Sequence, residues 1–159
     1  MKLTKGRPAL AATAWLALAL RATAATITVD STADDLDQGP NGNCTLREAV
    51  VAANTDSPVD GCAAGSGADV IQLPPGTYVL TIPGTSEHGE AGTLLLTSEI
   101  TIDGAGTDAT VVTAADLGDS LVTLPYISSG NPTVTIERLT IASENRKSSW
   151  GIVDSGLAS

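Results

Sequence analysis

Short hydrophobic runs recur along most of the chain, and residues 26–29 alternate polar and apolar residues with a period of two. Short runs rich in Val, Ile, Leu and Thr are separated by Gly, Pro, Asn and Asp. This pattern predicts short β-strands that are joined by turns. The predicted strands are 26–29, 70–73, 77–82, 94–96, 100–102, 111–113, 121–124, 134–136 and 139–141.

One segment departs from this pattern and predicts a helix. Thr45 is followed three residues later by Glu48, the spacing of a capping box, in which each side chain accepts the backbone N–H of the other residue. Asn54 suits the left-handed conformation that ends a helix. A helix this short must pack on an apolar surface, because it is not stable alone. Its predicted apolar stripe is Leu46, Ala49, Val50 and Ala53.

A weak repeat runs through the strand-rich part of the chain. Residues 100–103 and 134–137 share the order aliphatic, Thr, Ile, acid, and they begin 34 positions apart. Short strands with Gly or Asn turns suit the stacked coils of a parallel β-helix, but they also suit a β-sandwich. The hairpin signals Asn41-Gly42 and Asp60-Gly61 both precede the strand-rich region. The residues alone leave both folds open.

The start of the predicted helix adds a family resemblance. The segment Cys44-Thr45-Leu46-Arg47-Glu48-Ala49-Val50 resembles the Cys-Ser-Leu-Arg-Glu-Ala motif of the CSLREA family of bacterial secreted proteins. Five positions are identical, and Thr45 replaces Ser with the same capping chemistry. The likeness extends from about Ile27 to Val112. It implies an all-β fold, a right-handed parallel β-helix (solenoid) of the pectin lyase-like type with a short N-terminal capping α-helix.

The chain is therefore expected to have three parts. Residues 1–24 form a signal peptide, residues 25–68 hold the N-terminal strand, loop and capping helix, and residues 69–159 hold the first coils of the β-helix. Residues 150–156 resemble segments that open further coils in such proteins. The solenoid is therefore expected to be incomplete at its C-terminus, since a last coil needs a cap.

The first residues carry the signal for export. Lys2, Lys5 and Arg7 precede an apolar run of twelve residues, and small residues follow it, so cleavage is expected between Ala24 and Ala25. A transmembrane anchor is the alternative, but twelve residues are too short to cross a bilayer. We expect a secreted or cell-surface protein with no stable membrane span after cleavage.

Removal of this segment changes the charge of the chain. Four of the eight basic residues leave, so four remain against eighteen acidic ones, a formal charge of −14. Such a surface excludes nucleic acid and anionic membranes as favourable partners. The chain also has no Phe, which leaves Val, Ile, Leu and Ala to fill its core.

Both cysteines flank the predicted helix. In an exported chain, Cys44 and Cys62 predict one disulfide. A metal pair is the alternative, but it lacks further ligands, since His88 is the only histidine.

An oxygen-rich loop precedes the helix and offers a candidate calcium site. Asp35 and Asp37 have the alternate spacing of calcium ligands, and Asn41 and Asn43 follow them. Turn-forming Asp and Asn residues explain the same stretch. Apart from this calcium, no cofactor is expected.

No catalytic residue is assigned. Asn54-Thr55-Asp56 and Asp34-Asp35 resemble acidic motifs of polygalacturonases, but both precede the strand-rich region and stand in the wrong order. Arg47 and Glu48 are interpreted as structural, with Glu48 in the capping box and Arg47 either covering the loop or paired with a nearby acid.

The function expected from the sequence is that of a secreted or cell-surface structural, adhesin-like and non-enzymatic β-helix protein. Its ligand would be a carbohydrate or a protein. The alternative is the N-terminal part of a carbohydrate-active enzyme, a polysaccharide lyase or hydrolase with its catalytic coils elsewhere. A carbohydrate-binding module is a third hypothesis, although few aromatic residues are present for stacking on sugars.

Overall fold

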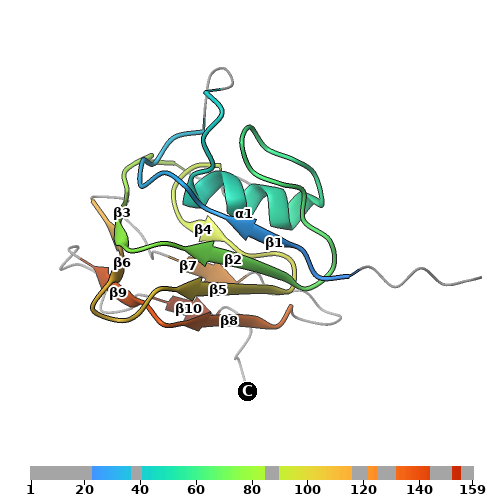
Figure 1. The fold of residues 1–159 in the computed structure, drawn as a ribbon. Helices are drawn as coiled ribbons and strands as arrows, with labels where there is room; N and C mark the ends of the chain where they lie inside the picture. Colours follow the sequence, from blue (N-terminus) through green and yellow to red (C-terminus); the bar gives the residue numbers. More distant parts are fainter. Residues whose placement is uncertain are drawn as a thin grey trace, which may run out of the picture.

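The computed structural model describes residues 23–36, 41–84, 90–115, 122–124, 132–143 and 152–154. These residues form ten strands and one helix (Figure 1). In chain order they are β1 (Thr26–Thr28), α1 (Leu46–Thr55), β2 (Asp69–Leu73), β3 (Gly76–Leu80), β4 (Leu94–Leu95), β5 (Ile100–Gly104), β6 (Thr110–Ala114), β7 (Val122–Leu124), β8 (Val134–Glu137), β9 (Thr140–Ser143) and β10 (Ile152–Asp154). The predicted strands are confirmed to within a few residues at their ends, and β10 was not predicted.

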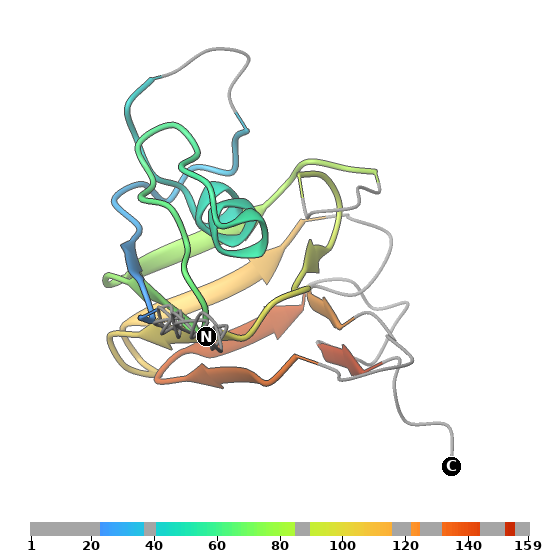
Figure 2. The same cartoon turned by 90° about the vertical axis from the view of Figure 1, so that its right-hand side faces the viewer.

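The strands form three small sheets in which every pairing is parallel. The orders are β1-β2-β5-β8, β3-β6-β9 and β10-β7-β4. Parallel neighbours need crossover connections, so each strand pairs with one that is distant in the sequence. Figure 2, turned by 90°, shows the sheets beneath the helix.

Aliphatic side chains in register form the core of the first sheet. Ile27 pairs with Ile71, Ile71 with Ile102, and Ile102 with Ile136. The first three are buried and Ile136 is half-buried. The predicted repeat also has a structural counterpart, because Ile100 pairs with Val134.

The helix is a buried layer of this core. It lies over β1, β2 and β4 (Figure 1). All eight residues from Leu46 to Ala53 are buried, including Arg47 and Glu48. Five consecutive apolar residues, 49–53, account for this, since a helix that is apolar all round is enclosed on every side.

The end of the helix differs from the prediction. The left-handed residue is Asp56, at φ 50°, and Asn54 remains helical. The Asn54 side-chain amide instead donates to the carbonyl of Leu95 at 2.7 Å and accepts the N–H of Thr97 at 2.8 Å. Asn54 therefore joins the helix to the chain around β4, a contact that outweighs its preference for a terminal position.

The predicted fold class is wrong. The described residues combine short, separate parallel sheets with a helix that is buried over residues 46–53, which is a mixed α/β arrangement, and no closed solenoid is detected among them. The prediction of an all-β right-handed parallel β-helix treated the helix as a cap across the open end of the solenoid. The burial of residues 46–53 makes it part of the core instead.

The expected division of the chain is only partly described. Most of the predicted signal peptide, residues 1–22, lies outside the described residues. Residues 25–68 hold β1 and α1, and the remaining strands follow. No helix within the described ranges is long and apolar enough to cross a membrane.

Candidate functional site

The motif that carries the family resemblance lies in the interior. Each of the six residues from Cys44 to Ala49 exposes at most 1% of its surface. Arg47 is the largest fully buried side chain in the described residues. A buried guanidinium needs a partner charge and hydrogen bonds, because its removal from water is otherwise very costly.

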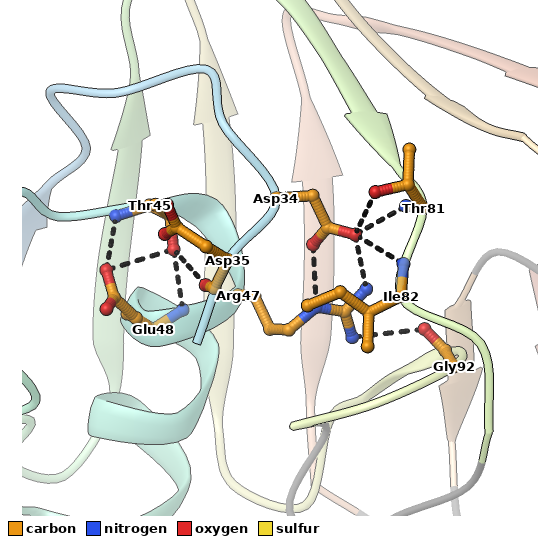
Figure 3. Close-up of polar contacts among 8 residues, drawn as sticks. All are labelled: Asp34, Asp35, Thr45, Arg47, Glu48, Thr81, Ile82 and Gly92. Carbon is orange, nitrogen blue, oxygen red and sulfur yellow. Dashed lines mark hydrogen bonds and ion pairs between the residues drawn. The ribbon is translucent and has the colours of Figure 1, made fainter. Parts of the chain in front are cut away.

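Asp34 supplies that partner charge (Figure 3). The Nε and Nη2 groups of Arg47 donate to the two carboxylate oxygens of Asp34 at 2.7 and 3.2 Å. The side chains of the pair are 0% and 2% exposed. Of the two structural roles expected for Arg47, the structure shows the pairing with a nearby acid. Such two-point pairing is specific to the planar guanidinium.

The same pair fastens two further segments to the helix. The Asp34 carboxylate accepts the backbone N–H groups of Thr81 and Ile82, just after β3. Arg47 Nη1 donates to the carbonyl of Gly92 at 3.1 Å. Four separate stretches of chain therefore meet at one buried ion pair (Figure 3).

These contacts hold Asp34 in its charged form. Burial alone would raise the pKa of the carboxyl group, but the hydrogen bonds from Arg47, Thr81 and Ile82 and the Arg47 charge outweigh it. The pKa of Asp34 therefore lies below its ordinary value. An enclosed, fully paired carboxylate of this kind is suited to holding the fold and has no face toward a substrate.

The capping box at the helix start is confirmed. The backbone N–H of Thr45 donates to Glu48 Oε2 at 2.9 Å, and the N–H of Glu48 donates to Thr45 Oγ1 at 3.3 Å. Burial raises the pKa of Glu48, and the nearby charges of Asp35 and Asp60 add to the rise against the hydrogen bonds from Thr45. Glu48 thus caps the start of the helix, although burial there disfavours its charged form.

The disulfide is confirmed between Cys44 and Cys62, whose Cα atoms are 4.7 Å apart. It joins the loops on either side of the helix. Beside it, the Asp60 carboxylate accepts the N–H of Asn41 at 3.0 Å and that of Gly42 at 2.9 Å. A Cβ on Gly61 would lie 2.4 Å from the Gly42 carbonyl oxygen, so this close approach requires glycine.

The candidate calcium residues lie in the loop that precedes the helix. Asp37 is outside the described residues. Asp35 offers its backbone carbonyl to Thr45 Oγ1 at 3.1 Å, and Asn41 Oδ1 accepts the N–H of Asn43 at 2.8 Å. The latter contact is a common turn closure. Within the described part of the chain, no group of three or more His, Cys, Asp or Glu side chains is placed to hold a metal ion.

The residues that resemble polygalacturonase motifs are used elsewhere. Asp34 pairs with Arg47, Asn54 binds the chain near β4, and Asp56 ends the helix. Reasoning from sequence expected an acid beside Arg47 but did not identify it as Asp34. The available signal was an arginine in the first turn of a helix whose residues 49–53 are all apolar, since a cation buried there must bring an acid into the core.

The described residues also form a small open cleft. It has a volume of about 200 Å³ and lies beside the ends of β2 and β5. Asp103 and Arg138 form an ion pair there, with side chains 12% and 61% exposed. Ligand pockets usually have about 300–1,000 Å³, so this cleft could hold only part of a ligand. Its residues include Thr28, Gln72, Gly104 and Ala105.

Comparison of the chain with protein-family models, with curated proteins and with solved structures finds no match. The likeness of residues 44–50 to the CSLREA motif accordingly remains a resemblance of sequence.

Proposed function

We propose that this chain is an exported structural protein of the secreted or cell-surface, adhesin-like kind, and that its described part has no catalytic role. The observation that carries the proposal is the burial of the whole Cys44–Ala49 motif. Its charged residues, Arg47 and Glu48, are consumed by contacts within the fold. A motif so enclosed stabilises the chain and leaves ligand binding to the surface.

Two further features support an extracellular location. The Cys44–Cys62 disulfide is of the kind that persists in oxidising compartments. The predicted signal peptide would deliver the chain to such a compartment. The strongly acidic mature chain supports a soluble surface and weighs against nucleic acid as a partner.

The proposed ligand is a carbohydrate or another protein. The cleft at Asp103 and Arg138 supports the carbohydrate, because a carboxylate and a guanidinium side by side can hydrogen-bond to sugar hydroxyl groups. Its small volume suits contact with one sugar unit of a longer chain.

Export and function can be tested separately. For export, the full chain is expressed in a bacterial host, and the protein outside the cytoplasm is examined by intact-mass measurement. We expect a chain that begins at Ala25 and contains no free thiol. A full-length chain retained in the cytoplasm would contradict export.

For function, the purified protein is incubated with a panel of polysaccharides that includes polygalacturonate. We expect no release of reducing or unsaturated ends, and saturable binding to one glycan or to intact cells. Binding to a glycan should weaken in Arg138→Ala and remain in the exposed control Asp108→Asn. Release of products that depends on the protein would contradict the structural role and favour the carbohydrate-active alternative.

A further inference from the structure

The first residue of the expected mature chain contacts a buried carboxylate. The backbone nitrogen of Ala25 lies 3.1 Å from Asp69 Oδ1 and donates a hydrogen bond to it. Asp69 is only 1% exposed and begins β2, whereas Ala25 immediately precedes β1. The backbone N–H of Val70 donates in turn to the Ala25 carbonyl at 2.9 Å. The residue is thus held from both sides.

The Asp69 carboxylate is incompletely satisfied in the described part of the chain. Oδ1 also accepts the N–H of Ser66 at 2.7 Å, but the buried Oδ2 has no hydrogen-bond partner among the described residues. Only two Lys or Arg residues lie within the described ranges, Arg47 and Arg138, and their ion pairs are with Asp34 and Asp103. A buried carboxylate without a cation or a full set of donors is costly.

Cleavage at the predicted site would place the missing positive charge on the Ala25 nitrogen, which already donates to Asp69 Oδ1. Hydrolysis of the Ala24–Ala25 bond consumes one water molecule. The carbonyl carbon of Ala24 gains the hydroxyl group and ends as a carboxylate, and the nitrogen of Ala25 takes up the protons and becomes an ammonium group. An α-amino group has an ordinary pKa of about 7.7–8.0, so most of it is charged at neutral pH. One N–H donor becomes three, with a full positive charge.

We propose that removal of the leader completes the fold, because the new α-ammonium group of Ala25 forms a partly buried ion pair with Asp69 and fastens β1 to β2. Thr23 and Ala24, on the leader side of the bond to be cut, are exposed. The inference rests on the export proposed above. It adds that processing also stabilises the protein that it releases.

The test compares two starting points and two side chains. Chains that begin at Ala25 and at Thr23 are prepared with Asp69 and with Asp69→Asn, by cutting a fusion protein without leaving extra residues. The unfolding equilibrium constant is measured by urea titration with far-UV circular dichroism. With Asp69, we expect the start at Ala25 to lower this constant about 10- to 100-fold, the usual worth of a hydrogen bond to a charged group. In Asp69→Asn the difference should disappear.

A control variant and a second measurement make the result decisive. Asp108→Asn removes an exposed acid and should keep the full dependence on the starting residue. If Asp69→Asn does not fold, the two chains that retain Asp69, one beginning at Ala25 and one at Thr23, are compared by the rate at which their α-amino groups are acylated. The rates are measured at neutral pH in the folded and the urea-unfolded states. We expect the folded chain that begins at Ala25 to react at least about tenfold more slowly than the one that begins at Thr23.

Two results would overturn the proposal: equal stability of both starting points with Asp69 present, or equal acylation rates of their amino groups. An intact mass of the exported protein that shows a start other than Ala25 would also overturn it. These outcomes differ from a failure of export, in which the leader remains attached and the chain stays in the cytoplasm. Stability that does not depend on the starting residue, in a chain correctly exported and cut, would leave the proposed function intact.

Discussion

Replacing Arg47 by Met is the sharpest test of the buried ion pair. The change keeps much of the length and apolar stem of the side chain but removes its charge and its donors. Asp34 then remains 2% exposed in its side chain, with backbone N–H groups from Thr81 and Ile82 but no cation, and the Gly92 carbonyl loses its contact with the guanidinium. Breaking a buried pair in this way costs about 3–5 kcal/mol.

That loss is large against the total stability of a domain, which is about 5–15 kcal/mol. Arg47→Lys retains the charge but cannot form the two-point contact, so we expect a smaller loss of about 2 kcal/mol. The free energy of unfolding would be measured by urea titration with circular dichroism. Arg138→Met is the matched control, because it breaks a second Arg–Asp pair whose arginine is 61% exposed.

A double-mutant cycle isolates the interaction itself. We expect Asp34→Asn and Arg47→Met to lose less together than the sum of their separate losses, because the second change removes the carboxylate that the first leaves unpaired. The reasoning is refuted if Arg47→Met costs no more than Arg138→Met, or if the two changes at Asp34 and Arg47 are simply additive.

Three further predictions concern the same region. Removing the disulfide by changing both Cys44 and Cys62 to Ser should cost about 3 kcal/mol for a loop of 18 residues, and a thermal melt with and without reductant should show the same loss in the unmodified chain. The pKa of Asp34 is lowered from 3.8 on folding, so between the folded and the unfolded pKa the folded state binds fewer protons than the unfolded state. The stability due to Asp34 is therefore complete above the unfolded pKa and is lost as pH falls through the folded pKa. Urea titrations across this pH range should show a shallower loss of stability toward acid in Asp34→Asn, and an unchanged slope would refute the assignment. Gly61→Ala should cost about 1–3 kcal/mol, because its Cβ would clash with the backbone of Gly42, and full stability in the same titration would contradict that contact.

Local signals in the sequence were sufficient to predict the start of the helix and the disulfide. Thr45 and Glu48 are three residues apart and predict their mutual contacts without any knowledge of the fold. Cys44 and Cys62 are the only cysteines, so their pairing follows once export is assumed. Strand positions were also predicted, since short apolar runs bounded by turn-forming residues mark them without knowledge of the fold.

Contacts between loops were not predictable in this way. Asp34 lies in a stretch without periodicity, and nothing in its neighbours indicates that it folds back onto a helix thirteen positions later. The fold class failed for a related reason. Strand and turn patterns fix the local conformation, but they do not report how the strands close around a helix. The continuous apolar run from Ala49 to Ala53 did indicate burial on all sides, and it outweighed the amphipathic stripe that suggested a cap.

The place of the helix and disulfide between β1 and β2 has a consequence for the order of folding. Ile27 and Ile71 pair across more than forty residues, and that intervening segment contains α1 and both cysteines. Pairing of such distant strands is slow, because the chain must first lose the entropy of closing the loop. Once Cys44 and Cys62 are joined, the path between the two strands is shorter by 18 residues, which reduces that entropy loss by about 0.5 kcal/mol. A chain oxidised before its first sheet assembles should therefore refold faster than its reduced form.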